Sequence, residues 1–159
     1  MTALTQDMIE LLAAGVAHQV GACTAEGLPV LCRGLAATVE DDGRLVVVLS
    51  GESGCEVLAA IRHNGQVAAN FTLPETYRSM QLKGRDAEVR HGGARYRALV
   101  DARHRAFAAQ LAAYGFPPAY TTAWYNVPDD DLMTIRFTPY GAWNQTPGPG
   151  AGNALALKA

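Results

Sequence analysis

Residues 29–50 contain two strand-like segments joined by a tight turn, and this pair constrains the fold more than any other feature. The first segment, PVLCRGLAATVE, runs into a DDG turn at residues 41–43, which is a strong hairpin signal. The second, RLVVVLS, is apolar without interruption from Leu45 to Leu49. Such a run is typical of a strand whose two faces are both covered. The chain is therefore expected to contain an antiparallel sheet with a fully buried strand.

The remaining chain continues the same mainly β pattern. Further strands are expected at 16–24, 66–73, 78–90 and 132–143, the third of them kinked at Gly84. Helices are expected after Thr5 and at 54–63 and 94–114, and a loop at 115–131. Six mostly antiparallel strands with three helices favour a small β-barrel or rolled sheet with helices at its rim. One domain over 1–145 is expected, followed by a flexible Gly/Pro-rich tail over 146–159.

Composition excludes several classes of function. Hydrophobic residues make up 49% and charged residues 18%, which is typical of a globular domain. The net charge of −2 provides no general attraction to nucleic acid or to an anionic membrane. No apolar run approaches the roughly 20 residues needed to span a bilayer. Three cysteines without a CxxC pair, and an N-terminal segment unlike a signal peptide, favour a cytoplasmic location.

The segment LSGESGCEVLAAIRHNG, residues 49–65, has two competing interpretations. Ser53 and Glu56 fit a capping box, in which each side chain accepts from a backbone N–H of the other residue. Alternatively, free N–H groups at the helix start could hold a phosphate. Glu56 would repel a phosphate, so this second interpretation needs a cation from elsewhere. Arg33, on an apolar strand face, could supply that charge or could instead pair with an acidic side chain.

The order of these elements, together with RGLAAT (33–38) and YRSMQLKGRDAEV (77–89), resembles the FMN-binding split-barrel family that includes pyridoxamine 5′-phosphate oxidase. The resemblance covers roughly residues 5 to 115, with a looser match at 132–143. It implies a six-stranded antiparallel split β-barrel with peripheral helices. It also implies a homodimer that binds FMN in a groove between subunits and oxidises or reduces a small-molecule substrate.

The same resemblance implies a set of cofactor-binding residues. They lie on the arginine-bearing strand, at the end of the next strand, in the phosphate loop, and on strands that face the flavin ring. The set comprises Arg33, Gly34, Leu35, Ala36, Leu49, Ser50, Ser53, Ser79, Gln81 and Trp143. No catalytic acid or base is identified. Trp143 is the expected stacking residue, whereas Tyr120, Trp124, Tyr125 and Tyr140 are expected mainly at the dimer interface.

The chain departs from the family pattern in its positive charges. Cys55, Glu56 or Val57 stands where the family carries a basic pair, and Thr38 replaces a lysine. The Arg-x-His motif of pyridoxamine phosphate oxidases is absent from RFTPYGAWNQTPG, so that activity is not expected. The alternative is a non-enzymatic binding or scaffold protein with lost or altered cofactor affinity. A family member that uses a deazaflavin or haem is a further variant.

Metal and nucleophile chemistry have little support in the sequence. The four histidines show no HxxxH spacing, so no metal site is expected. Cys23, Cys32 and Cys55 are interpreted as small apolar residues. Cys55, near a helix start, is the only one for which a reactive thiolate is considered, and neighbouring Glu52 and Glu56 oppose it.

Overall fold

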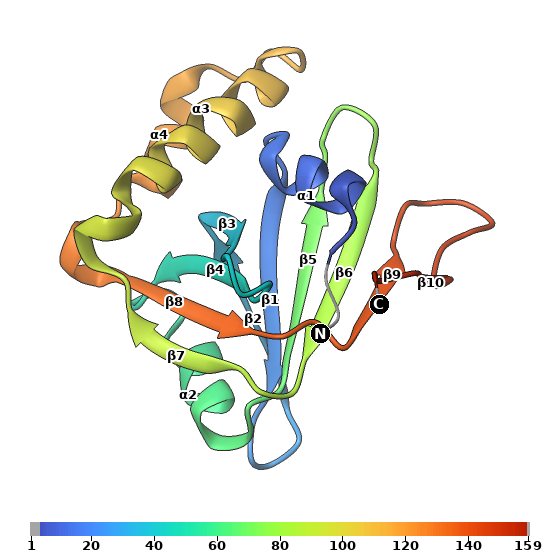
Figure 1. Cartoon of the computed structure of the whole chain (residues 1–159). Helices are drawn as coiled ribbons and strands as arrows, with labels where there is room; N and C mark the ends of the chain where they lie inside the picture. Colours follow the sequence, from blue (N-terminus) through green and yellow to red (C-terminus); the bar gives the residue numbers. More distant parts are fainter. Residues whose placement is uncertain (1–3, 159) are drawn as a thin grey trace.

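Two antiparallel sheets face each other across a common core in the computed structural model, which describes residues 4–158 (Figure 1). The larger sheet has the order β10-β9-β6-β5-β1-β2. Its strands are β10 (Ala154–Leu155), β9 (Gly141–Asn144), β6 (Ser79–Gly84), β5 (Val67–Thr72), β1 (Ala17–Cys23) and β2 (Pro29–Gly34). The smaller sheet has the order β3-β4-β8-β7. Its strands are β3 (Ala36–Val39), β4 (Leu45–Ser50), β8 (Leu132–Phe137) and β7 (Glu88–His91).

Three of the expected strands each cross from one sheet to the other. The segment 29–40 divides at Leu35 into β2 and β3, 78–90 divides after Gly84 into β6 and β7, and 132–143 divides after Phe137 into β8 and β9. The expected bend at Gly84 is confirmed, because β6 ends there and β7 lies in the other sheet. Glycine is needed at this position, since a Cβ atom would lie 2.4 Å from Cδ2 of Phe137. These bends curl the chain into a barrel split between two sheets, so the expected fold class is confirmed.

The main core fills the space between the sheets. Strand β4 is buried along its whole length, as its unbroken apolar sequence predicts. Along β1 and β5, alternate side chains point inward, which is the pattern of strands with one covered face. The largest wholly buried side chains of this core are Leu12, Leu45, Leu49, Leu58, Ile61, Phe71, Met80, Leu82, Ile135 and Phe137.

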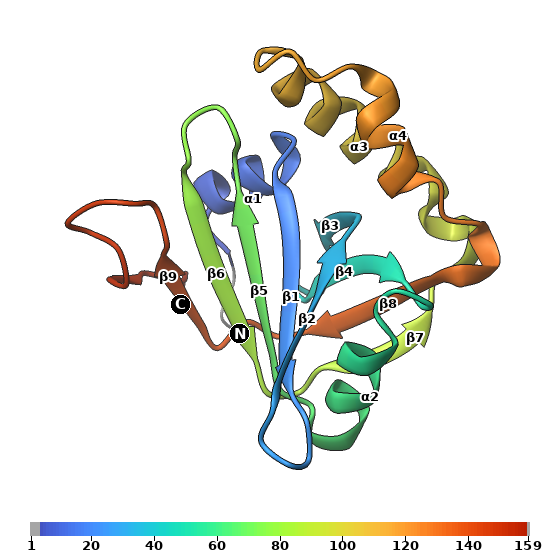
Figure 2. The same ribbon diagram turned by 180° about the vertical axis from the view of Figure 1, so that it is seen from behind.

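Two short helices lie at opposite ends of the larger sheet (Figures 1 and 2). Helix α1 (Gln6–Ala13) begins at Thr5, whose hydroxyl accepts from the backbone N–H of Met8 at 3.3 Å. Helix α2 (Cys55–Asn64) follows β4 and ends at Gly65, which has the left-handed φ of 68° that favours glycine. Both helices bury their apolar faces against the barrel, which closes its ends.

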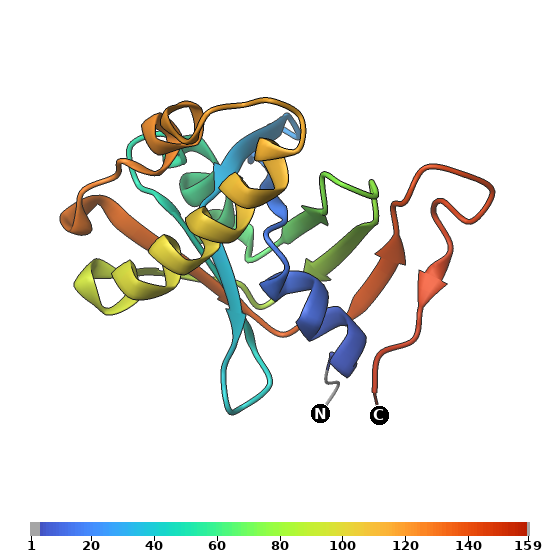
Figure 3. The same cartoon turned by 90° about the horizontal axis from the view of Figure 1, so that it is seen from above.

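A helical hairpin packs on the outer side of β3, β4 and the start of β8 (Figures 1 and 3). A short 3₁₀ turn, Gly93–Tyr96, leads into α3 (Arg97–Ala112), which is followed by α4 (Pro118–Tyr125). Between hairpin and sheet lies a second core of Leu35, Ala36, Val48, Val100, Phe107, Tyr125 and Leu132. The expectation of a loop at 115–131 is wrong over α4. The signal for that helix is the pair Pro117-Pro118, since proline is well tolerated in a first helical turn.

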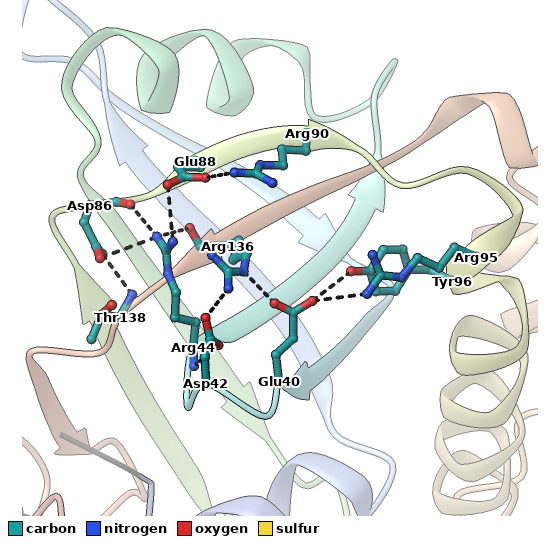
Figure 4. Close-up of polar contacts among 10 residues, drawn as sticks. All are labelled: Glu40, Asp42, Arg44, Asp86, Glu88, Arg90, Arg95, Tyr96, Arg136 and Thr138. Atoms are coloured by element: carbon teal, nitrogen blue, oxygen red, sulfur yellow. Dashed lines mark hydrogen bonds and ion pairs between the residues drawn. The ribbon is translucent and has the colours of Figure 1, made fainter. Parts of the chain in front are cut away.

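An ion-pair network ties the β3–β4 turn to β7 and β8 (Figure 4). Arg136 of β8 donates to Glu40 at 2.5 Å and also pairs with Asp42. Arg44 contacts Glu88 at 3.2 Å and Asp86 at 3.5 Å. Because each arginine here faces carboxylates of this chain, the network holds the strands together.

The segment after residue 145 is docked in part. Ala154 and Leu155 pair with Trp143 and Ala142 of β9, and Leu155 and Leu157 pack against the main core. This pairing orders part of the segment expected to be a flexible tail. Within residues 4–158, no helix is long and apolar enough to cross a membrane, and no group of three or more acidic, histidine or cysteine side chains is placed to hold a metal ion.

Candidate functional site

Five side chains form one row across the outer face of the larger sheet. Strand pairing places Arg33 opposite Gln19, Gln19 opposite Asn70, Asn70 opposite Gln81, and Gln81 opposite Trp143. All five occupy outward positions, because their strand neighbours point into the core. Figure 2 looks onto the strands that carry this row, which is called the amide row below. Sequence reasoning selected Arg33, Gln81 and Trp143, and the structure brings these three together.

The centre of the amide row offers hydrogen-bonding groups on an exposed surface. Nδ2 of Asn70 donates to Oε1 of Gln19 at 3.2 Å and lies 3.1 Å from Oγ1 of Thr72. The side chain of Gln81 makes no hydrogen bond to another described residue. A primary amide carries two donor hydrogens and an acceptor oxygen. Since few of these groups are committed within the chain, the row can present both donors and acceptors to a ligand.

Each end of the amide row pairs a cation with a tryptophan. The guanidinium of Arg33 lies 4.1 Å from the ring centroid of Trp124 on α4. Nζ of Lys83 lies 4.7 Å from the ring centroid of Trp143. Both are cation–π distances, so each ring holds a positive charge at its face. Trp124 also packs against the rings of Phe107 and Tyr120, and its place at a dimer interface stays a prediction.

One depression lies at the Arg33 end of the row, and a second lies beside the row. The first, of about 270 Å³, is lined by Ala17, Gln19, Leu31 and Arg33, among others. A broader one of about 680 Å³ lies beside it and is lined by Gly21, Leu31, Ala68, Lys83 and Tyr140, among others. The side chain of Leu31 is 72% exposed between them. The lining of the broader depression is mainly apolar and includes Pro29 and Val30 beside Leu31, and contiguous apolar surface of this kind is typical of interaction sites.

Ser79 lies on the same face but is committed within the chain. Its Oγ is 2.8 Å from Oγ1 of Thr72 and 2.9 Å from the carbonyl oxygen of Tyr77. Its backbone N–H donates to Oγ1 of Thr146, and its carbonyl oxygen accepts from the N–H of Gln145. The residue is buried, and in this structure it fastens the chain beyond β9 to β6.

Four other candidate residues contribute no exposed side chain. Leu35 and Ala36 lie in the core beneath the helical hairpin, and Leu49 lies in the main core. Gly34 has no room for a side chain, since a Cβ would lie 2.8 Å from that of His18. Ligand contact by these four would therefore have to use backbone atoms.

The loop between β4 and α2 is occupied by a carboxylate of this chain. Oδ2 of Asp131 accepts from Oγ of Ser50 at 2.5 Å, and Oδ1 accepts from the backbone N–H of Glu52 at 2.8 Å. The carbonyl oxygen of Asp131 also accepts from the N–H of Gly51 at 2.8 Å. Asp131 is placed here because it directly precedes β8, whose first residue, Leu132, pairs with Ser50.

The next three N–H groups of the loop also have partners. Ser53 N–H donates to Oγ of Ser50 at 3.1 Å, Gly54 N–H to the carbonyl of Ser50 at 3.0 Å, and Cys55 N–H to the carbonyl of Glu52 at 3.4 Å. The capping-box interpretation is wrong, because α2 begins after Gly54 and no side chain caps it. Ser50 and Ser53 therefore lie together as expected, but they surround Asp131.

A buried histidine sits inside the barrel on β1. His18 is 1% exposed, and neither ring nitrogen has a hydrogen-bond partner. Burial, followed by the charges of Arg103 and Arg33, lowers the pKa of His18 from 6.5 to about 3. The imidazole is consequently neutral at physiological pH. Burial also raises the pKa of the Cys32 thiol to about 11, which makes Cys32 an inert packing residue, as expected.

Sequence reasoning missed Gln19, Asn70, Trp124 and Asp131. The strand alternation placed Asn70 on the polar side of β5, but only the register between strands aligns it with Gln19 and Gln81. Trp124 lies in the helix that was taken for a loop. Asp131 lies about 80 residues from its loop along the chain, and no local pattern connects the two.

The fold is similar to several solved structures, although no family model and no curated protein matches the sequence. HupZ from Group A Streptococcus matches with a TM-score of 0.58 and 17% identity, over 94% of this chain and 99% of that one. A pyridoxamine 5′-phosphate oxidase-related, FMN-binding protein from Nostoc punctiforme matches with a TM-score of 0.51 and 13% identity, over 91% of this chain and 84% of that one. This chain has the pyridoxamine 5′-phosphate oxidase-like split-barrel fold. General Stress Protein 26 from Bacillus anthracis matches the split barrel with a TM-score of 0.50 and 14% identity, over 87% of this chain and 91% of that one.

The ring and the phosphate of an FMN molecule are not equally well matched by the residues of this split barrel. The amide row, with a tryptophan at each end, is compatible with a flat heterocycle that has donors and acceptors along its edge. Residues 50–55 of the β4–α2 loop do not suit a phosphate, because Asp131 accepts from Ser50, Gly51 and Glu52, and the loop also carries Glu52 and Glu56. The residues present thus fit the ring and do not fit the phosphate at this loop.

Proposed function

We propose that this split barrel binds a flavin, with FMN as the first candidate, on the outer face of the larger sheet. The observation that carries the proposal is the amide row, in which Gln19, Asn70 and Gln81 lie side by side between Arg33 and Trp143. A flavin ring is planar and carries both N–H and carbonyl groups on one edge. Neighbouring primary amides can satisfy both kinds of group.

The chain would act as an oxidoreductase on a small molecule. A bound flavin supplies the electron transfer, and the protein orients the ring and limits the access of water. Trp143 offers a stacking surface, and Arg33 and Lys83 place positive charge at the two ends of the row. Such charge favours the anionic form of a reduced ring.

A second copy of this chain would cover the site. Leu31 and the small residues Gly21 and Ala68 form an open, weakly polar area next to the amide row. Interfaces of homodimers are more apolar than the remaining surface, and this face has that character. A ligand on the row would then lie between subunits, which would exclude solvent from the ring.

The alternative is a non-enzymatic binding or scaffold protein that has lost affinity for FMN. The β4–α2 loop favours this alternative, because the carboxylate of Asp131 occupies the place where the family resemblance puts the FMN phosphate. A single titration separates the two: FMN is added to the purified protein, and flavin fluorescence is followed. Saturable quenching at micromolar FMN, lost in Arg33→Ala and kept in the exposed control Arg62→Ala, supports the flavin proposal. No saturation up to about millimolar FMN contradicts it.

A further inference from the structure

We infer that Asp131 serves as the built-in anion of the β4–α2 loop and closes this loop to any phosphate group. The inference concerns the chain itself and holds whether or not a flavin binds. Its basis is the account of the donors from Gly51 to Cys55, which precede the N–H groups of Glu56 and Val57 in the first turn of α2, both free within residues 4–158. From Gly51 to Cys55, each backbone N–H has a partner within the chain, and the hydroxyl of Ser50 donates to the same carboxylate.

The geometry of Asp131 is that of a bound oxyanion. Its two carboxylate oxygens accept from two different groups, Oγ of Ser50 at 2.5 Å and N of Glu52 at 2.8 Å. Charge-assisted hydrogen bonds of this length are about twice as strong as neutral ones. The carboxylate lies close against the loop backbone: a Cβ added at Gly51 would lie 3.0 Å from Oδ1 of Asp131.

Charge reinforces the closure. A phosphate entering the loop would have to displace Asp131, in a segment that already carries the acidic residues Glu52 and Glu56. Negative charges repel one another, and the donors of Ser50, Gly51 and Glu52 already have an acceptor before any phosphate arrives. The ligand class of this split barrel is therefore one recognised through its ring, with no phosphate held at residues 50–55.

Removal of the internal anion tests the inference without any flavin. In Asp131→Ala, the donors of Ser50 and Glu52 lose their partner, and a small anion should replace it. We expect formate or inorganic phosphate to raise the melting temperature of this variant by at least about 3 °C more than that of the wild type, at matched ionic strength. Comparison with the wild type is needed because phosphate stabilises folded proteins in general.

The adjacent aspartate provides a matched control. Asp130 lies in the same turn, and its carboxylate makes no hydrogen bond to another described residue, so Asp130→Ala should respond to anions as the wild type does. Asp131→Ser also removes the carboxylate and leaves room for an anion, and it serves if the alanine variant does not fold. Amide signals of Gly51, Glu52 and Ser53 in a ¹H–¹⁵N spectrum should shift saturably with phosphate in the Asp131 variants only.

Two results would overturn the inference. One is an equal response of Asp131→Ala and the wild type to formate and phosphate. The other is a saturable shift of the Gly51–Ser53 amides in the wild type. Failure of FMN to bind would contradict the proposed function, but it would not affect the inference about Asp131. If flavins do bind, FMN and riboflavin should differ in dissociation constant by less than about tenfold, since the loop adds no charge-assisted hydrogen bond.

Discussion

The imidazole of His18 meets the ring of Phe71 edge to face, with centroids 5.7 Å apart and an interplanar angle of 90°. This aromatic contact, in place of hydrogen bonds, holds a titratable group inside the barrel. The two residues are cross-strand partners on β1 and β5. Neither ring nitrogen of His18 has a hydrogen-bond partner, so a charged imidazole would be buried without compensation. The neutral form is therefore favoured at this position.

The buried histidine predicts acid sensitivity in an unusual pH range. The pKa of His18 is about 3 when folded, against 6.5 ordinarily, so the unfolded chain binds the extra proton between these values. Stability should fall as pH drops below 6.5, by up to about 1.4 kcal/mol per pH unit. Urea unfolding at pH 7.5, 6.5, 5.5 and 5.0 measures this slope. His18→Leu should flatten it and exposed His63→Gln should keep it; equal slopes in all three proteins would refute the assignment.

The bend between β6 and β7 predicts intolerance to a single methyl group. In Gly84→Ala, the new Cβ would lie 2.4 Å from Cδ2 and 2.9 Å from Cβ of Phe137, which is itself fully buried. The free energy of unfolding should fall by about 1–3 kcal/mol, as for other overpacked cores. Urea denaturation provides the measurement. Gly21→Ala is the control, since its nearest neighbour would be 3.7 Å away; similar losses in both would argue against this packing.

The amide row predicts graded losses of flavin affinity. Asn70→Ala and Gln81→Ala each remove hydrogen-bonding groups from the row, and a typical neutral hydrogen bond contributes about 1 kcal/mol. Each change should therefore raise the flavin dissociation constant about fivefold, measured by fluorescence titration. Gln6→Ala, on exposed α1, should have no effect. Unchanged affinity in both row variants, in a protein that binds flavin, would place the ring elsewhere.

The exposed outer face of the larger sheet around Leu31 is predicted to be the interface of a homodimer. Leu31→Glu puts a charge in the middle of this face and should convert a dimer to a monomer, because an unpaired charge in an interface is costly. Light scattering after size-exclusion chromatography reports the mass. Ile9→Glu, at an exposed position on α1, is the control and should stay dimeric. A monomeric wild type, or a dimer unaffected by Leu31→Glu, would exclude this interface.

Local sequence determined most of the elements and the class of the fold. The DDG turn between β3 and β4, the apolar run of β4, the Thr5 cap of α1 and Gly65 after α2 all act over a few residues, and each is found where the sequence places it. Backbone preferences and side-chain periodicity act over a few residues, so they can be recognised in the sequence alone. The resemblance to split barrels rested on the order of these elements.

Tertiary structure decided where the long strands bend and what the site contains. Strand register, which no single strand encodes, aligned Gln19, Asn70 and Gln81 into one row. Pairing of β4 with β8 brought Asp131 onto a loop that by local chemistry resembled a capped helix or a phosphate site. The sequence by itself could show that the loop had donors to satisfy. Only the folded chain, by joining residues about 80 positions apart, decided that its own carboxylate would satisfy them.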